Sequence, residues 1–227
     1  LNDIARFQKV NASSADPTLF TASAEKTAAL GNYTLEVQQL ATSQKLSSKG
    51  FANTTDTVGT GTLQIQFGTY DSGANTFSLN ADKPARSIAI DSSKQSLAGI
   101  RDAINEANAG VTASIVNDGT ANKLVVTSSD TGTVNTLRIL VKDDDGNNTN
   151  DAGLSQLAYD PTAAAGSGKN LSESTAAADA KVVVDGVTLT KASNTVKEAI
   201  EGVTLSLTKV GAAAKLTVER DAGIVRN

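Results

Sequence analysis

The sequence predicts a mainly β fold with a few short helices, an α+β protein made of two β-rich domains. The core has to be built from Val, Ile, Leu and Ala, because the 227 residues contain no Cys, Met or Trp and only 4% are aromatic. Short runs rich in β-branched residues recur along the chain, and Gly, Asn or Asp residues bound them. One clear stretch of helical periodicity stands among these runs.

That helical stretch is followed directly by two strands. Apolar residues recur at helical spacing over 97–108, with Ser96 placed as the N-cap and Gly110 as the stop. After the glycine the period changes to two, which predicts strands at Val111–Val116 and Lys123–Thr127. The helix is expected to fill a core, and none of its residues forms a catalytic pattern.

Further strands are expected on both sides of this stretch. They are Tyr33–Leu40, Leu63–Phe67, Asn75–Leu79, Arg86–Asp91, Thr136–Val141, Lys181–Val184, Val187–Thr190, Val203–Thr208, Lys215–Glu219 and, in an ambiguous region, Leu19–Ala22. The dipeptide Asp185-Gly186 is typical of a tight hairpin between two of them. We expect Tyr33–Leu40 to share one antiparallel sheet with Val203–Thr208 and Lys215–Glu219.

Two more short helices and two linkers complete the predicted organisation. The helices are expected at Leu1–Asn11 and from Ser193 through Ile200. The polar stretch Ser43–Thr62 and the Gly/Ala/Ser-rich span that ends near Ala178 are predicted to be linkers or crossing points between domains.

Composition excludes several classes of partner. The net charge of −4 and the lack of a basic stripe argue against nucleic acid. No apolar run approaches the roughly 18–20 residues of a membrane span, so no membrane insertion is expected. The lack of Cys does not distinguish between two locations. It is compatible with the cytosol and equally with the cell exterior, reached by unfolded export through a narrow channel.

We expect no enzyme, no cofactor and no catalytic residue. The absence of His and Cys excludes the usual base-activated Ser mechanisms and all Cys mechanisms. A Ser–Lys dyad or a pair of carboxylates stays open, but no motif in a convincing context supports either. The acidic run Asp143–Asp151 resembles a calcium loop, yet placing Gly146 at position 6 puts Val141 at position 1. A solvated turn with no metal is therefore expected there.

Three other motifs are assigned structural roles. Gly59–Gly61 and Gly166–Lys169 lack the spacing of phosphate loops and are expected to be flexible connectors. Arg101 and Asp102 are adjacent on the helix, where side chains point in different directions, so a solvated face or a subunit contact is expected.

Four segments together resemble one family, the bacterial flagellar filament cap protein (flagellar hook-associated protein 2), in order and spacing. They are GNYTLEVQQLA (Gly31–Ala41), SLAGIRDAINEANAGVTASIVNDG (Ser96–Gly119), KLVVTSSDTG (Lys123–Gly132) and VDGVTLTKASNTVKEAIEGVTLSL (Val184–Leu207). The helix-plus-strand segment by itself resembles a module shared with flagellins. The resemblance implies a helical leg-domain remnant at 1–30, a discontinuous β-rich domain at 31–58 and 173–227, and an inserted distal domain at 59–172 that carries the 97–108 helix.

The resemblance also implies a function outside the cell. It implies a structural assembly factor at the filament tip, exported through the flagellar secretion channel, that retains exported flagellin and promotes its polymerisation. Flagellin and other cap subunits would be the partners, and the homo-oligomer would form through coiled-coil segments outside this chain, leaving the fragment monomeric or weakly associated. One alternative is an adhesive module that binds host mucus or glycans. Another is a variable domain of a different flagellin-like or hook-associated protein.

Overall fold

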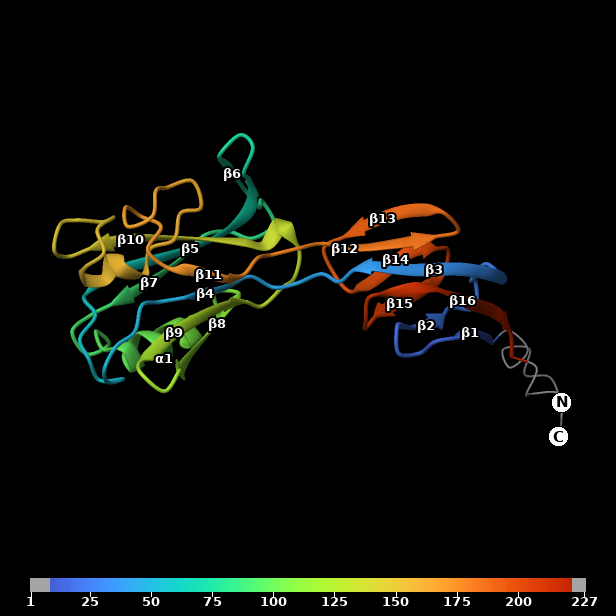
Figure 1. The fold of residues 1–227 in the computed structure, drawn as a ribbon, viewed down its shortest axis with the longest axis horizontal. Helices are drawn as coiled ribbons and strands as arrows, with labels where there is room; N and C mark the ends of the chain where they lie inside the picture. The colour runs from blue at the N-terminus through green and yellow to red at the C-terminus, as the bar shows by residue number, and fades with distance from the viewer. Residues whose placement is uncertain (1–8, 222–227) are drawn as a thin grey trace. The chain divides into compact units, whose positions relative to one another are not determined.

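The computed structural model describes residues 9–221 and confirms the mainly β fold, with one α-helix in that range (Figure 1). The chain divides into two compact units. Unit 1 takes the described chain up to Ala41 and from Asp179 onward, and unit 2 is continuous from Thr42 to Ala178. The crossings between the two compact units fall at 41/42 and 178/179, whereas the family resemblance implied 58/59 and 172/173.

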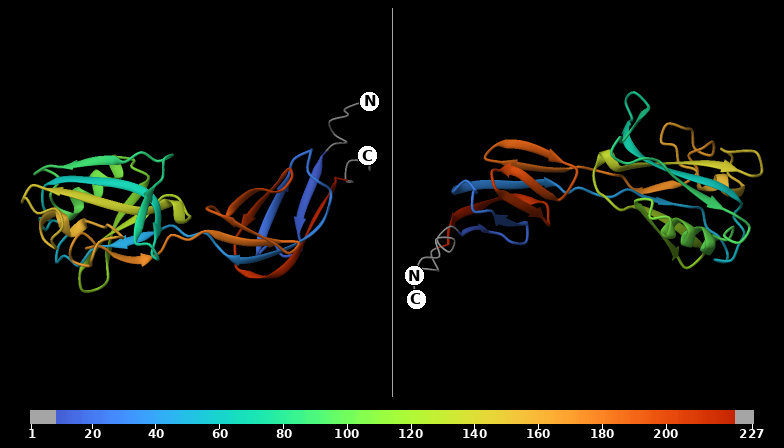
Figure 2. Two further views of the ribbon diagram at one scale, coloured as in Figure 1. Left: turned by 90° about the horizontal axis from the view of Figure 1, so that it is seen from above. Right: turned by 180° about the vertical axis from the view of Figure 1, so that it is seen from behind.

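Unit 1 is a sandwich of two antiparallel sheets (Figures 1 and 2). The five-stranded sheet has the order β1-β16-β3-β12-β13, and the three-stranded sheet has the order β14-β15-β2. Their bounds are β1 Val10–Ser14, β2 Phe20–Ala24, β3 Gly31–Gln39, β12 Ala180–Val184, β13 Val187–Lys191, β14 Thr195–Ile200, β15 Val203–Leu207 and β16 Gly211–Arg220. Residues of both sheets share one core, in which Phe20, Leu35 and Leu205 are fully buried.

Unit 2 contains two four-stranded antiparallel sheets and the helix. One sheet has the order β10-β5-β6 with β7 also paired to β5, and the other has the order β11-β4-β9-β8. The bounds are β4 Lys45–Ser47, β5 Gly61–Asp71, β6 Thr76–Leu79, β7 Arg86–Ile90, α1 Leu97–Glu106, β8 Val111–Asn117, β9 Asn122–Ser128, β10 Thr136–Asp143 and β11 Ser172–Thr175. Two 3-10 turns are η2 Thr133–Asn135 and η3 Gly153–Leu157. Both sheets and α1 contribute to a single core.

Helix α1 forms where its pattern predicts. The Ser96 hydroxyl accepts a hydrogen bond from the Gly99 N–H at 3.1 Å, and the helix turns Ile100 and Ile104 into the core. It ends at Glu106, two residues before the expected limit, because Asn108 already adopts a left-handed backbone with φ 46°.

Both additional helices differ from expectation. Strand β14 replaces the helix predicted through Ile200, because Val196 and Ile200 share a face in a strand as well as in a helix. A bulge follows Lys197, where Glu198 has φ 61°. Most of the helix predicted at Leu1–Asn11 lies on residues 1–8, which are outside the described range. The prediction is wrong for its last residues, because they belong to β1, which pairs with β16.

The two expected linkers also proved to be packed parts of unit 2. Ser43–Thr62 includes β4 and buries Leu46 and Val58. The Gly/Ala/Ser-rich span includes η3 and β11 and buries Leu154 and Tyr159. Sequence periodicity missed these segments because their few apolar residues reach the core from irregular backbone.

The expected sheet around β3 is half correct. Strand β3 pairs with β16, as predicted, but β15 pairs with β2 in the opposite sheet. The alternation of buried Val203, Leu205 and Leu207 fits either inner face of a sandwich, so it could not select the sheet.

A buried glutamine joins several strands of unit 2. The fully buried Gln44 donates from Nε2 to Glu173 on β11, and its Oε1 accepts the Leu137 N–H of β10 at 2.6 Å. Its backbone carbonyl accepts the Ser128 N–H of β9 at 2.9 Å. Beside it, burial together with the charge of Glu173 raises the pKa of Tyr159 to about 12, so that phenol stays neutral.

Replacing Ile104 with Asp should unfold unit 2 and leave unit 1 folded. The change removes a buried side chain, which costs about 2–5 kcal/mol, and buries an unpaired carboxylate, in a domain whose whole stability is about 5–15 kcal/mol. Denaturant melts followed by tyrosine fluorescence and circular dichroism measure this. The control Glu106→Ala removes only an exposed ion pair to Lys94 and should cost within about 0.5 kcal/mol. Equal small shifts for both variants would contradict the placement of α1.

Candidate interaction surfaces

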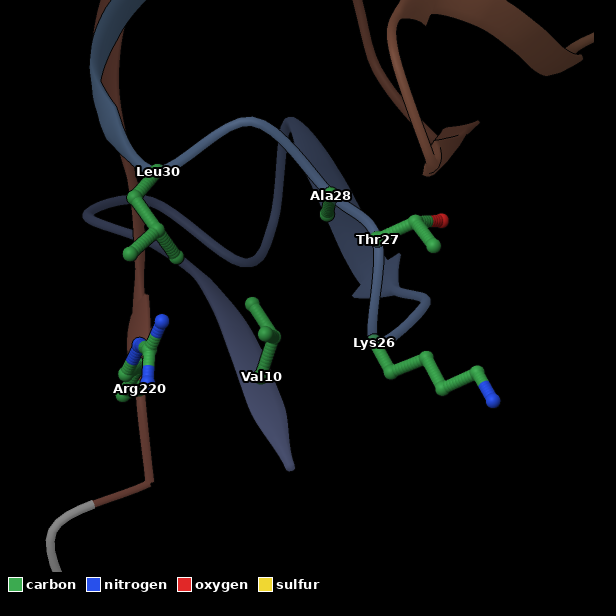
Figure 3. Close-up of a pocket in the computed structure, with 6 residues that line it drawn as sticks. All are labelled: Val10, Lys26, Thr27, Ala28, Leu30 and Arg220. Atoms are coloured by element: carbon green, nitrogen blue, oxygen red, sulfur yellow. The ribbon is translucent and has the colours of Figure 1, made fainter. Parts of the chain in front are cut away.

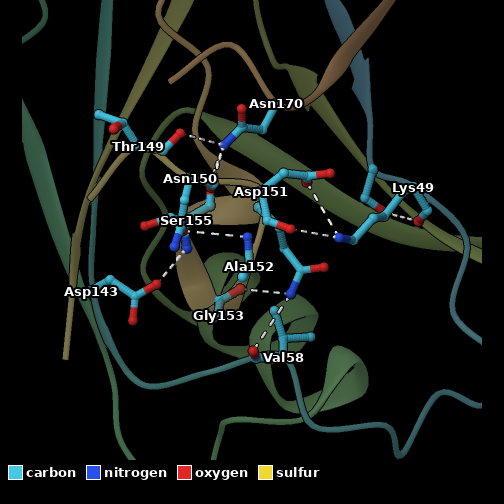
Figure 4. Close-up of polar contacts among 12 residues, drawn as sticks. Lys49, Val58, Asp143, Thr149, Asn150, Asp151, Ala152, Gly153, Ser155 and Asn170 are labelled. Atoms are coloured by element: carbon cyan, nitrogen blue, oxygen red, sulfur yellow. Dashed lines mark hydrogen bonds and ion pairs between the residues drawn. The ribbon is translucent and has the colours of Figure 1, made fainter. Parts of the chain in front are cut away.

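The acidic loop Asp143–Asp151 is held by hydrogen bonds within it and by one to Ser155, which Figure 4 shows. The Asp143 carboxylate is buried and accepts the Ser155 N–H at 2.7 Å and the Asp145 N–H at 3.2 Å. The Asn148 side chain accepts the Asp143 N–H at 2.8 Å. The loop is thus less solvated than expected at its start. Within residues 9–221, no three or more Asp or Glu side chains are placed so that they could hold a metal ion together.

The same loop is attached to the rest of unit 2. The Asn170 amide donates to the carbonyls of Asn150 and Ser155, both at 2.7 Å (Figure 4). The Lys49 ammonium contacts the Asp151 carbonyl at 2.9 Å and its carboxylate at 3.3 Å. These contacts fix the loop in place, which is a structural role.

The glycine motifs serve backbone packing and turns. A Cβ on Gly59 would lie 2.4 Å from the Leu154 nitrogen, and one on Gly61 would lie 2.1 Å from the Lys142 carbonyl oxygen. The expectation of a flexible connector at Gly59–Gly61 is therefore wrong, since the glycines allow close approach of two backbones. In Gly166–Lys169, the Gly166 N–H donates to the Lys169 carbonyl at 3.2 Å and closes a turn.

Arg101 and Asp102 contact each other on the helix surface. The guanidinium donates to both carboxylate oxygens, at 2.8 Å and 2.9 Å. The argument from helix directions was wrong here because the arginine side chain is long enough to fold back onto its neighbour. The pair is partly exposed.

Sequence reasoning missed two asparagines whose side chains each bond to both backbone groups of one distant residue. Asn105 of α1 accepts the Ala113 N–H at 2.8 Å and donates to the Ala113 carbonyl at 2.9 Å, on the free edge of β8. Asn194 makes the same two bonds to Ala41, at 2.7 Å and 2.9 Å. Each side chain imitates a neighbouring strand, and only the folded chain brings these partners together.

Two shallow grooves in unit 1 are lined by charged side chains of opposite sign. The basic groove, about 340 Å³, has Val10, Ala28 and Leu30 as apolar lining with Lys26 and Arg220 beside them (Figure 3). It adjoins the ends of the described chain, where the Lys9 ammonium lies 3.5 Å from the Asp221 carboxylate. The acidic groove, about 390 Å³, includes Tyr33, Val187, Leu189, Ala199, Asp185 and Glu201 in its lining.

The exposed turn between β8 and β9 contains an ion pair and several hydrogen bonds to one carboxylate. The Lys123 ammonium lies 2.8 Å from the Asp118 carboxylate, and the Thr120 hydroxyl donates to that carboxylate at 2.6 Å. Together with backbone N–H groups they hold the pKa of Asp118 well below its usual 3.8.

Family models match three parts of the chain. The flagellar hook-associated protein 2 N-terminus matches residues 1–44, and the corresponding C-terminus matches 177–227. These ranges correspond closely to the two segments of unit 1. The flagellin hook IN motif matches 68–130, which contains α1, β8 and β9 of unit 2.

Solved structures decide the assignment. The crystal structure of the D2-D3 domains of the flagellar cap protein FliD from Escherichia coli is 34% identical, with a TM-score of 0.78 over 94% of this chain and 100% of that one. The chain belongs to the flagellar hook-associated protein 2 family. The family resemblance drawn from the four sequence segments is therefore confirmed.

Two further relatives support the assignment. FliD (HAP2) from Pseudomonas aeruginosa PAO1 is 34% identical with a TM-score of 0.70, over 92% of this chain and 88% of that one. The B-type flagellar hook-associated protein 2 of Pseudomonas aeruginosa is 37% identical over 100% of this chain and 47% of its own length. This chain thus spans about half the length of the curated relatives it matches.

These relatives are named as structural proteins of the flagellum, and none of the names describes an enzyme. In the part of the chain that the structure describes, no helix has the length and apolar character needed to cross a membrane.

Replacing Asp118 with Asn should destabilise unit 2 at pH 7 and much less in acid. The lowered folded pKa means that the carboxylate contributes stability above its unfolded pKa of about 3.8, and this contribution is lost as the pH falls toward the folded value. A double-mutant cycle with Lys123→Ala, melted at pH 7 and pH 2, measures the coupling. A coupling that is equally strong at both pH values would contradict the ionic origin of the effect.

Proposed function

We propose that this chain forms the outer part of the flagellar filament cap, outside the cell at the filament tip. There it retains exported flagellin and promotes its polymerisation beneath the cap. The observation that carries the proposal is the 34% identity to the D2-D3 domains of the Escherichia coli cap protein over that protein's whole solved chain. The match of unit 1 to the hook-associated protein 2 models, and of residues 68–130 of unit 2 to the flagellin hook IN motif, support it further.

The proposed mechanism is mechanical and steric, and it uses no cofactor. Each unit has its own apolar core, so each can act as a rigid body that flexes about the crossings at 41/42 and 178/179. Flagellin and neighbouring cap subunits are the proposed partners, and the grooves of unit 1 are surfaces that they could contact.

Glycan binding is not part of the proposal. Sugar-binding surfaces commonly offer uncovered aromatic faces, but two of the rings in unit 2 have a cation over one face. The Arg138 guanidinium lies 4.6 Å from the centre of the Phe77 ring, and the Lys83 ammonium lies 4.4 Å from that of Phe67. A binding assay of this chain on immobilised mucin glycans tests the adhesive alternative directly.

The proposal is tested in a cap-deficient cell. The full-length protein that contains this chain should restore filament growth and reduce unpolymerised flagellin in the medium. A matched variant joins Ala41 to Asp179 through a short linker and lacks unit 2, which leaves unit 1 intact. It should be exported but restore shorter or fewer filaments. If the intact protein reaches the filament tip and flagellin is still lost to the medium, the proposal is wrong.

A further inference from the structure

The sheet edges of this chain are not equally protected against pairing with another polypeptide. On the edge of β8, Asn105 occupies both backbone groups of Ala113. On β14, a bulge at Glu198 and the charge of Lys197 interrupt the edge. Bulges, charged residues and covering side chains are the usual means by which proteins block strand addition.

Strand β13 has no bulge in its pairing with β12, and its one charged residue is Lys191 at its end. Its residues before Lys191 are Val, Thr, Leu and Thr. It is the last strand of the five-stranded sheet (Figure 1), and no strand within residues 9–221 pairs with its other edge. Because a two-residue turn joins β12 to β13, Val187 bonds to Val184 across the hairpin, and the backbone groups of Thr188 and Thr190 point outward.

The acidic groove lies along this open edge. Val187 is 61% exposed, and Leu189 and Ala199 are only partly buried, so apolar side chains of β13 and β14 are left uncovered between the two sheets. An added strand whose alternate side chains point inward would cover them and extend the sandwich. The edge and the groove therefore form one composite surface.

The negative charge of this surface favours a bound segment that has positively charged residues beside its apolar ones. Asp185 and Glu201 are the charged residues that line the acidic groove. An adjoining hollow is lined by Glu25, Glu198 and Glu201 against Lys197 alone. A segment that carries Lys or Arg beside its apolar residues would complement this rim, and an acidic segment would be repelled.

We propose that the free edge of β13 and the acidic groove bind an extended segment of a partner polypeptide, apolar at alternate positions and flanked by Lys or Arg, as an added antiparallel strand. A second copy of this chain fits less well, because pairing through the same edge would bring two acidic rims onto one face. The inference rests on the proposed function for the source of the segment, a filament subunit that is still unfolded after export.

The binding test uses this chain and a synthetic probe. The probe is a short fluorescent peptide of alternating valine and threonine with a lysine at each end, measured by fluorescence anisotropy at low and high salt. Saturable binding that weakens with salt is expected. Two control peptides should bind far more weakly: one has N-methyl groups on alternate amides, and the other has glutamate ends.

Matched variants locate the site. Thr188→Pro removes an outward N–H and keeps the β12 ladder, since proline is tolerated on edge strands with the N–H side facing solvent. It should weaken probe binding about tenfold or more, while Thr188→Ala leaves binding unchanged. Glu201→Gln should reduce affinity about threefold, mainly at low salt. Asp185 is avoided because its carboxylate also accepts the Thr34 N–H at 2.7 Å.

A second pair of variants tests the groove. Val187→Lys should weaken binding, and Val116→Lys, at a similarly exposed valine on β8 in unit 2, should not. Thermal melts confirm that every variant is folded. Binding that survives Thr188→Pro overturns the proposal, as does the lack of saturable binding. Self-association that Thr188→Pro abolishes, without probe binding, would assign the edge to a second copy. If the peptide does not bind while the full-length protein still restores filaments, this inference is wrong and the proposed function is unaffected.

Discussion

Unit 2 is closed by the pairing of its own two ends. Thr42 and Ala178 exchange backbone hydrogen bonds at 2.9 Å and 3.2 Å, and β4 then pairs with β11 from Lys45↔Thr175 to Ser47↔Ser172. The rest of unit 2 depends on this pairing, because β4 is also the strand on which β9 forms its ladder. A unit inserted into another can fold without distorting it only if its ends lie close together, and this ladder provides that closeness.

The side chain that secures the pairing is Gln44. The side-chain amide connects β11 to β10, and the backbone carbonyl of the same residue accepts a hydrogen bond from β9. Gln44 and Leu137 are fully buried, so loss of the glutamine side chain would leave the Leu137 N–H without a partner, at a cost of about 1–3 kcal/mol. The apolar core gives the unit its stability, and Gln44 determines which strands meet.

Local signals in the sequence were sufficient for elements with a strong period or a required turn residue. Ser96 and the stripe through Ile104 predicted α1, and Asp185-Gly186 predicted the β12–β13 hairpin with its left-handed turn. Local signals failed for β14, because the spacing of its apolar residues Val196 and Ile200 fits both a helix and a strand. They also failed for the acidic groove, because Tyr33 and Ala199 meet there only through long-range pairing. The family could be identified from the order and spacing of four sequence segments, which do not depend on knowing the three-dimensional contacts.

Hydrogen exchange with mass spectrometry on Gln44→Ala tests the central claim, that pairing at the ends holds unit 2 together. The account predicts faster exchange throughout unit 2, including α1, while unit 1 keeps its protection. The exposed Gln38→Ala on β3 is the control and should leave both units protected. Faster exchange confined to the residues around Gln44, or an equal loss of protection in unit 1, would contradict the account.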